Sequence, residues 1–226
     1  SQHPIMTPAR PHRQSPSPDP VPSPELLLSA YLQGAFPMAD PDTGRIDWYS
    51  PDPRGVLPLD ERFHVPGTVG RLVRQGRFEV VRDRDFIAVM QACAAPRPDE
   101  DGTWIDERLV EAYGRLHQLG FAHSIEAWRD GRLVGGLYGV RIGAAFFGES
   151  MFIRPDLGGS GASKVCLVRL VDHLRAIGGR LLDTQFTTEH LERFGAEEIP
   201  REIYLRQLAE ALEHPTDWDA GPIPAG

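Results

Sequence analysis

The sequence predicts an α+β protein, with a small N-terminal α/β lobe followed by a larger domain built on a mixed, largely antiparallel sheet. Asp130-Gly131 lies between two strand-like runs, which is a strong signal for a β-hairpin. A glycine-rich loop then joins a strand to an amphipathic helix expected over 162–177. Ahead of residue 96, short helical patterns alternate with a single strand. With 226 residues and 41% hydrophobic content, the chain can form one sizeable core or two small ones.

The N-terminal part divides into a leader and a lobe. Residues 1–24 hold eight prolines and few apolar side chains, so we expect 1–22 to be disordered and 1–5, ahead of Met6, to be a remnant of expression. The lobe is expected over 23–96. Ser23 is a favourable helix N-cap and Pro24 a favourable first helical residue. The following segments are a helix ending at Gly34, a turn-rich stretch over 36–57, a helix over 67–75, a strand over 77–82 and a helix over 85–94.

The second domain is expected over 103–213, with a flexible tail over 214–226. Asp106 caps a helix that ends near Gly120. After it we expect strands over 122–128, 133–140 and 144–152, the helix over 162–177, a strand over 180–186, and helices from Thr188 and from Pro200. This order of elements is that of the N-acetyltransferase superfamily, a GNAT-type fold. The fold alone specifies no function.

Charge and composition argue against several classes of protein. A net charge of −8 argues against a general nucleic-acid binder, so any polyanion must dock on a local patch. One such patch, Arg62, Arg71, Arg74 and Arg77, has no acidic residue within it. No long apolar run or signal peptide is visible, and Cys93 and Cys166 have no metal-ligand spacing. We therefore expect a cytoplasmic protein with no membrane association and two buried structural thiols.

The segment from Arg154 to Lys164 has the composition of a phosphate-binding loop. Its glycines allow backbone N–H groups to approach an anion, and the helix N-terminus adds a favourable dipole. Lys164 is the only lysine of the chain, and Arg154 supplies a second charge. The spacing is not that of a Walker loop. A plain glycine-rich connection before a helix explains the same residues equally well.

Three polar residues lie in strands that are otherwise apolar. Glu149 belongs to the run Gly148-Glu149-Ser150-Met151-Phe152, and Asp183 and Gln185 alternate along one strand, so they are expected to share a face. Buried acidic groups are costly and often serve a functional site. A carboxylate that only fixes the backbone or pairs with an arginine remains the alternative.

Trp48, Tyr49 and Trp104 lie in loop-like segments, where they could stack on a nucleobase or cover the seam between the lobes. The histidines, including His123 and His190, form no metal-binding motif, so we expect no metal.

Motifs along most of the chain, from about Leu26 to Leu212, resemble one family, the leucyl/phenylalanyl-tRNA–protein transferases of the bacterial N-degron pathway. They are Ala30-Tyr31, Gly34-Ala35-Phe36-Pro37, Trp48-Tyr49-Ser50-Pro51-Asp52-Pro53-Arg54, Phe63-His64-Val65, Thr103-Trp104-Ile105, Ala122-His123-Ser124, Leu133-Val134-Gly135-Gly136-Leu137-Tyr138-Gly139, Gly148-Glu149-Ser150-Met151-Phe152, Ala162-Ser163-Lys164, Asp183-Thr184-Gln185, Gly195-Ala196 and Ile199-Pro200-Arg201. The chain departs from the family at Ile153-Arg154 and in the longer loop 157–161, where a short link is usual.

The resemblance implies an enzyme that transfers leucine or phenylalanine from Leu-tRNA or Phe-tRNA to an N-terminal Arg or Lys of an acceptor protein and so marks it for degradation. It implies catalytic roles for Asp183, Gln185 and Glu149, an aminoacyl pocket of Met151, Phe146 and Leu137, and contacts of Trp48 and Trp104 with the tRNA 3′ adenosine. The tRNA phosphates would be bound by Arg54, Arg62, Arg71, Arg74, Arg77, Arg154 and Lys164. No cofactor or metal is implied, and a monomer is expected.

Three other functions remain to be weighed. An acyl-CoA-dependent N-acetyltransferase would share the fold. A non-catalytic binder of N-terminal degrons would need the acidic pocket but no aminoacyl site. A peptidoglycan bridge transferase usually repeats the acyltransferase domain and carries a helical arm, which this sequence does not show.

Overall fold

The computed structural model describes residues 19–96 and 103–226, so most of the expected leader lies outside the described residues. The helices are α1 (Pro24–Leu32), α2 (Gly67–Gln75), α3 (Phe86–Ala94), α4 (Glu107–Gln118), α5 (Ala162–Ile177), α6 (Glu189–Glu192) and α7 (Arg201–Leu212), with 3₁₀ turns η1 (Pro155–Leu157) and η2 (Trp218–Ala220). The strands are β1 (Phe36–Ala39), β2 (Ile46–Tyr49), β3 (Arg54–Leu57), β4 (Glu79–Arg82), β5 (Ala122–Arg129), β6 (Arg132–Ile142), β7 (Ala145–Ile153), β8 (Leu181–Gln185) and β9 (Glu197–Ile199). Over the described ranges, none of these helices has both the length and the apolar character needed to cross a membrane.

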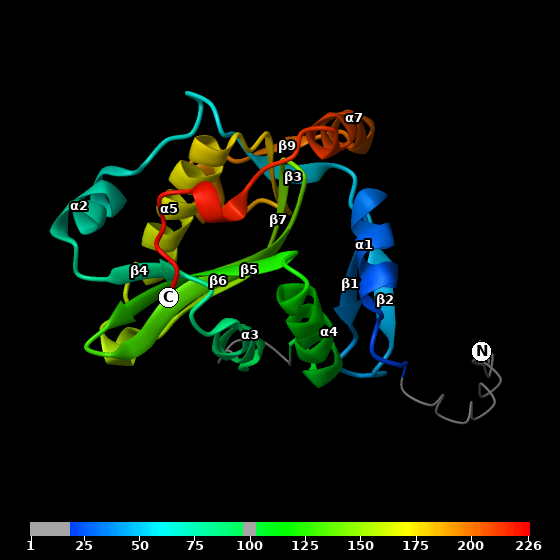
Figure 1. The fold of residues 1–226 in the computed structure, drawn as a ribbon, viewed down its shortest axis with the longest axis horizontal. Helices are drawn as coiled ribbons and strands as arrows, with labels where there is room; N and C mark the ends of the chain where they lie inside the picture. Colours follow the sequence, from blue (N-terminus) through cyan, green and yellow to red (C-terminus); the bar gives the residue numbers. More distant parts are fainter. Residues whose placement is uncertain (1–18, 97–102) are drawn as a thin grey trace, which may run out of the picture.

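Most of the strands form one seven-stranded sheet in the order β4-β5-β6-β7-β8-β3-β9. The β7–β8 pair is parallel, whereas the other neighbouring pairs are antiparallel. Strands β1 and β2 form a separate hairpin beside α1 (Figure 1). The protein is therefore α+β with a mixed, mostly antiparallel sheet and a small N-terminal sheet, as predicted.

The large sheet separates two apolar cores. Helices α1, α3, α4 and α7 cover one face, whose core includes Leu27, Tyr113 and Phe147. Helices α2 and α5 cover the other face, whose core includes Leu137 and Phe146. In Figure 1, α5 lies on one side of β5 and β6, and α3 and α4 lie on the other. We call these the α4 face and the α5 face.

Several local signals act as the sequence predicts. The Ser23 hydroxyl accepts a hydrogen bond from the Leu26 N–H at 3.1 Å, and Asp106 caps α4 through the N–H groups of Arg108 and Leu109. Asp130 and Gly131 both have positive φ angles, of 51° and 72°, as a type I′ hairpin turn requires.

The expectation of a turn-rich stretch over 36–57 is wrong, because this range contains β1, β2 and β3. Strand β3 lies between β8 and β9 in the large sheet, and β4 is also part of that sheet. Two strands from the range expected for the N-terminal lobe thus complete the main sheet. The prolines and aspartates around β3 resemble turn residues, but Arg54–Leu57 is buried along its whole length.

The flexible tail expected over 214–226 is instead packed against the domain. The Trp218 and Ile223 side chains are almost completely buried under α5, and the Trp218 carbonyl is bonded to His173 Nε2 at 2.8 Å. Beyond them, the Arg82 N–H donates to the Pro224 carbonyl at 2.9 Å, and the Gly226 N–H donates to the Arg82 carbonyl at the same distance. Burial of apolar surface accounts for this ordered path.

Two β-bulges and one divergence lie near the centre of the sheet. Gly139 pairs with Gly148 and Tyr138 with Ser150, which leaves Glu149 as the extra residue of β7. A second register shift leaves Thr184 as the extra residue of β8 opposite β3. The pairing of β7 with β8 ends at Phe147 and Asp183, although β7 continues to Ile153. Such bulges redirect side chains and are frequent beside active sites.

Candidate active site

The Asp183 carboxylate is bound by four donors from three parts of the chain. Arg54 donates from Nε to Oδ1 at 3.0 Å and from Nη2 to Oδ2 at 2.7 Å. The Tyr204 hydroxyl donates to Oδ2, and the Gln185 backbone N–H donates to Oδ1, both at 2.7 Å. A carboxylate offers about four acceptor positions, so this one is fully occupied. Asp183 is therefore an anchor for its neighbours and has no lone pair left for a substrate proton.

Arg54 is buried, with only 1% of its side chain exposed. Its third hydrogen bond, from Nη1, goes to the Gly34 carbonyl at 2.7 Å, and its guanidinium lies 5.0 Å from the Phe36 ring centre and 4.3 Å from that of Tyr204. A guanidinium this deeply buried is not exposed for the contact with tRNA phosphate that the sequence led us to expect. The contacts of the guanidinium are with protein groups. The buried Asp183 carboxylate needs a charged partner, and Arg54 is that partner.

Glu149 occupies the bulge of β7 and faces two donors. The Tyr31 hydroxyl donates to Oε1 at 2.5 Å, and Gln185 Nε2 donates to Oε2 at 3.0 Å. Burial away from water raises the pKa of the Glu149 carboxyl from 4.5 to about 8, against the opposing effect of these two hydrogen bonds. The carboxyl thus titrates near neutral pH, in the range useful for chemistry at an amine.

Gln185 is held at both its backbone and its side chain. Its N–H is bonded to Asp183, and its φ angle of 66° lies in the left-handed region that non-glycine residues rarely adopt. The expected regular alternation with Asp183 is therefore broken at Thr184 and Gln185, yet the two residues remain in one network. Because Nε2 is bonded to Glu149, the amide oxygen Oε1 is directed elsewhere and has no partner among the described residues. This oxygen is the unused acceptor of the network.

The chain is similar to the members of one protein family. The family model for leucyl/phenylalanyl-tRNA protein transferase matches residues 56–209, and the model for the N-terminal domain of the same protein matches residues 22–52. A transferase of this name from Salinibacter ruber is 52% identical over 87% of this chain and 83% of its own length. Another from Akkermansia muciniphila is 53% identical over 84% of this chain and 96% of its own.

The chain belongs to the leucyl/phenylalanyl-tRNA–protein transferase family. The family resemblance expected from the motifs is thereby confirmed, and with it the class of enzyme, an aminoacyltransferase. Among solved structures, a GCN5-related N-acetyltransferase-like protein from Streptococcus suis is 18% identical with a TM-score of 0.37, and the match spans 77% of this chain but less than two thirds, 63%, of that protein.

In this transferase, the three residues expected to form the aminoacyl pocket lie together. Leu137 on β6 is directly opposite Met151 on β7, and both belong with Phe146 to the apolar core of the α5 face. Met151 is only partly buried, whereas the other two are inside the core. The pocket residues and the Tyr31 contact thus lie on opposite faces of the sheet. Glu149 and Gln185 lie between them, where β7 and β8 diverge.

Trp48 and Trp104 are the residues expected at the tRNA adenosine: Trp48 is part of β2, and Trp104 is bonded to β1. Trp48 is 37% exposed and lines a groove of about 230 Å³ with Ala30, Gln33 and other residues around α1. The Trp104 carbonyl accepts from the Ala39 N–H at 3.0 Å, and its ring packs against the core of the α4 face. Trp48 is therefore the more accessible of the two.

The basic residues of the transferase, Arg54 apart, lie at or near the surface. Arg71, Arg74 and Arg77 are exposed on and after α2. Arg62 is exposed but pairs with Asp60 and Glu197, at 3.0 and 2.9 Å. Helix α2 packs against the start of α5. The approach is close, since a Cβ on Gly161 would lie 2.4 Å from Leu72. The patch is thus adjacent to the glycine-rich loop.

Lys164 and Arg154 flank that loop differently. Lys164, in the first turn of α5, is half-buried and forms no ion pair or hydrogen bond with the described residues. Arg154 donates to the Leu133 carbonyl at 3.0 Å, and its guanidinium lies over the Phe152 ring. The loop itself is packed on β6, since a Cβ on Gly159 would lie 2.1 Å from the Val134 carbonyl oxygen. Lys164 is therefore the available cation of the pair.

Three tyrosines of the site were not anticipated as functional residues. They are Tyr31, Tyr113 and Tyr204, of which the sequence motifs include only Tyr31. Buried tyrosine hydroxyls usually require a hydrogen-bond partner, and this was the only available signal. It could not indicate that Tyr31 reaches Glu149 and Tyr204 reaches Asp183.

A cluster of Asp83, His117 and His123 has the residue types of a metal site, with its ligand atoms within 4.8 Å of one another. Its polar atoms already have partners, however. Asp83 accepts from Trp218 Nε1 and is bonded to His123 Nδ1, and His117 Nδ1 is bonded to the Ala122 carbonyl. The cluster ties the C-terminal segment to the sheet.

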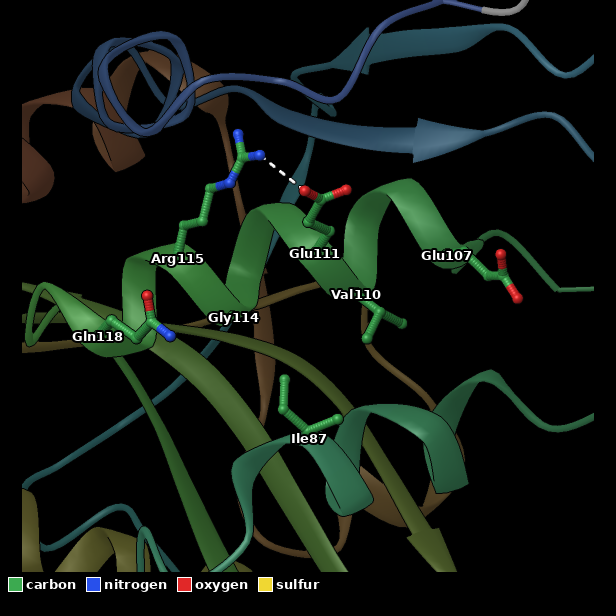
Figure 2. Close-up of a pocket in the computed structure, with 7 residues that line it drawn as sticks. All are labelled: Ile87, Glu107, Val110, Glu111, Gly114, Arg115 and Gln118. Carbon is green, nitrogen blue, oxygen red and sulfur yellow. Dashed lines mark hydrogen bonds and ion pairs between the residues drawn. The ribbon is translucent and has the colours of Figure 1, made fainter.

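A groove of about 420 Å³ lies between α3 and α4 (Figure 2). Ile87 and Val110 form its apolar part, and the Glu111–Arg115 ion pair, at 2.6 Å, lies along α4. None of the predicted site residues lines it.

Proposed function

We propose that the protein transfers leucine or phenylalanine from Leu-tRNA or Phe-tRNA to the N-terminal Arg or Lys of an acceptor protein and thereby marks it for degradation. The unused amide oxygen of Gln185, held in place by Asp183 and Glu149, carries the proposal. Such an oxygen can accept a hydrogen bond from the α-amine of the acceptor and direct the nitrogen lone pair toward the ester.

The reaction needs orientation more than activation. The amine nitrogen attacks the ester carbonyl, a C–N bond forms, the C–O bond to the ribose breaks, and the proton lost by nitrogen balances the one gained by the leaving hydroxyl. An α-amine with a pKa of about 7.7–8.0 is partly neutral at cytosolic pH. Placing it against the ester supplies much of the rate enhancement. We propose that no cofactor or metal takes part and that a cytoplasmic monomer suffices.

The remaining residues supply binding. Met151, Phe146 and Leu137 would receive the leucine or phenylalanine side chain, for which the flexible methionine thioether is well suited. Trp48 and Trp104 would contact the 3′ adenosine. Arg71, Arg74, Arg77 and Lys164, with Arg62 and Arg154 beside them, would bind tRNA phosphates. Arg54 is not included, because its guanidinium is enclosed by protein.

The experiment is transfer of radiolabelled leucine and phenylalanine from tRNA to peptides that begin with Arg, Lys, Asp or Ala. We expect label on the Arg and Lys peptides. Gln185→Ala should lower kcat by about 100-fold with tRNA affinity retained, and Asp183→Ala should do the same if the variant folds. Gln118→Ala on the exposed side of α4 is the matched control and should behave as wild type.

Each alternative function predicts a different result. Tight binding of tRNA and peptides without transfer would indicate a degron binder. Absence of transfer together with coenzyme A binding in calorimetry would favour an acyl-CoA-dependent acetyltransferase.

A further inference from the structure

Tyr31 and Tyr113 form a chain of hydroxyls that ends at Glu149. Both side chains are buried, at 1% and 0% exposure, and they come from α1 and α4. The Tyr31 hydroxyl is bonded both to Glu149 Oε1 and to the Tyr113 hydroxyl. When Glu149 is ionised, Tyr31 donates its only hydrogen to the carboxylate, so Tyr113 must donate to Tyr31.

A hydroxyl can also act in the reverse direction. If Glu149 binds a proton on Oε1, the carboxylic acid can donate to Tyr31, and Tyr31 can then donate to Tyr113. The other carboxyl oxygen, Oε2, still accepts from Gln185 Nε2. The same contacts therefore serve both protonation states of Glu149, and neither state requires the Gln185 amide to move.

Without the Tyr31 hydroxyl, the two states would differ. An ionised Glu149 would still accept from Gln185 Nε2. A protonated Glu149 would need another acceptor for its own hydrogen, and Gln185 Oε1 would take the place of Nε2 beside the carboxyl once the amide rotates by half a turn. That rotation would consume the oxygen that faces the substrate amine.

We propose that Tyr31, supported by Tyr113, is a positioning residue that keeps the Gln185 amide in one orientation whether or not Glu149 carries a proton. The inference rests on the proposed function for its link to catalysis. Its structural part concerns Glu149 and Gln185 alone and can be tested without any substrate.

Among the hydrogen-bond partners of Glu149, Tyr31 is the one whose hydroxyl can change from donor to acceptor. The charged and titratable groups whose fields act on Glu149 are Arg54 on β3, Asp183 on β8, Tyr113 on α4, Tyr138 on β6 and Tyr204 on α7. Arg54 and Tyr204 are committed to Asp183. The Tyr138 hydroxyl is buried without a partner among the described residues and so does not hold the carboxyl.

The test compares Tyr31→Phe with two matched tyrosine variants. For Tyr31→Phe we expect kcat about tenfold lower than wild type at pH 6.5, and the deficit should shrink only as the pH rises above the raised Glu149 pKa of the variant, with little change in KM for aminoacyl-tRNA. Tyr113→Phe keeps the contact of Tyr31 with Glu149 and should show a smaller loss. Tyr138→Phe removes a buried hydroxyl that has no bond to Glu149 and should follow the wild-type pH profile. A uniform loss at all pH values in Tyr31→Phe, or no loss, would overturn the proposal.

A second measurement separates this inference from the proposed function. Carbon NMR of labelled glutamate should show the Glu149 carboxyl titrating at higher pH in Tyr31→Phe, because a donor to the ionised form is lost. The Gln185 side-chain amide signals should shift with that titration in both proteins, but the hydrogen bond from Gln185 Nε2 to Glu149 should be lost on protonation only in the variant. Identical titrations would refute the role of Tyr31. Absence of transfer by wild type alongside the expected titrations would refute only the proposed function.

Discussion

Arg54 and Asp183 lie 129 residues apart in the chain and form an ion pair with two hydrogen bonds. Both side chains are buried. Asp183 in turn holds the backbone of Gln185 through a 2.7 Å hydrogen bond. The residues that line up in the sequence motif Asp-x-Gln thus have unequal tasks. Asp183 stabilises the turn, whereas Gln185 is the residue proposed to present an oxygen to the substrate.

Replacing Arg54 by methionine should destabilise the protein by about 3–5 kcal/mol, because Asp183 would remain as a buried charge without its partner. Chemical denaturation measures the change in the free energy of unfolding. Arg54→Lys should also destabilise, since a lysine cannot form the two-bond fork. In the double variant Arg54→Met/Asp183→Asn, part of the stability should return, and a simple sum of the two single effects would contradict the pairing.

Removing the Tyr204 hydroxyl should cost about 1.5–3 kcal/mol of stability, because the lost hydrogen bond has a charged acceptor. Tyr204→Phe keeps the ring that covers Arg54, so the thermal midpoint reports the hydroxyl alone. Transfer should slow as the Asp183 carboxylate gains freedom. A midpoint equal to that of wild type would show that the bond does not contribute.

The stability of the protein should depend on pH through Glu149. Its pKa rises from 4.5 in the unfolded chain to about 8 in the folded one, so between these values the folded state holds a proton that the unfolded state has released. Stability contributed by this group is complete below pH 4.5 and declines as pH rises to about 8. Glu149→Gln imitates the neutral acid and should be more stable than wild type at pH 8.5 but not at pH 5. Thermal melts at both pH values measure the difference.

The matched control for that experiment is Glu111→Gln, on the exposed side of α4. It should change the midpoint by a similar small amount at both pH values. If Glu149→Gln behaved in the same way, the folded-state pKa of Glu149 would lie close to its ordinary value.

Binding of tRNA should depend on salt through α2 and α5. Each phosphate contact contributes close to one unit to the slope of log affinity against log salt concentration, so Arg71→Ala, Arg74→Ala and Lys164→Ala should each lower the slope by about 1. Filter binding at several salt concentrations measures it. Arg54→Lys, if folded, should leave the slope unchanged, because its guanidinium does not face solvent. A reduced slope for Arg54→Lys would return this residue to the phosphate-binding group.

The sequence predicted those parts of the fold that depend on local signals. The Asp130-Gly131 turn, the Ser23 and Asp106 caps and the Gly178 end of α5 were all located correctly. Strand β3 was missed, because the prolines and aspartates before it look like a turn and only its neighbours β8 and β9 make it a strand. The tail was misread because its two buried residues, Trp218 and Ile223, contribute no periodic pattern.

Three residues of the candidate site could be singled out from the sequence, but their contacts could not. Glu149, Asp183 and Gln185 stood out as polar residues in apolar strands, and the structure brings them into one network. The bulge at Thr184 interrupts the regular alternation from which Asp183 and Gln185 were expected to share a face. The partners Tyr31, Arg54 and Tyr204 come from distant elements, so no spacing in the sequence could have identified them.

The path of the C-terminal segment has a consequence for self-association. Strand β4 is the outermost strand on one side of the large sheet, and residues 224–226 form hydrogen bonds with its last residue, Arg82. The outermost strand on the other side, β9, is only three residues long. An open, regular edge strand can recruit a strand from another molecule. With the end of β4 bonded to its own chain and β9 this short, the regular edge that another molecule could pair with is reduced on both sides of the sheet.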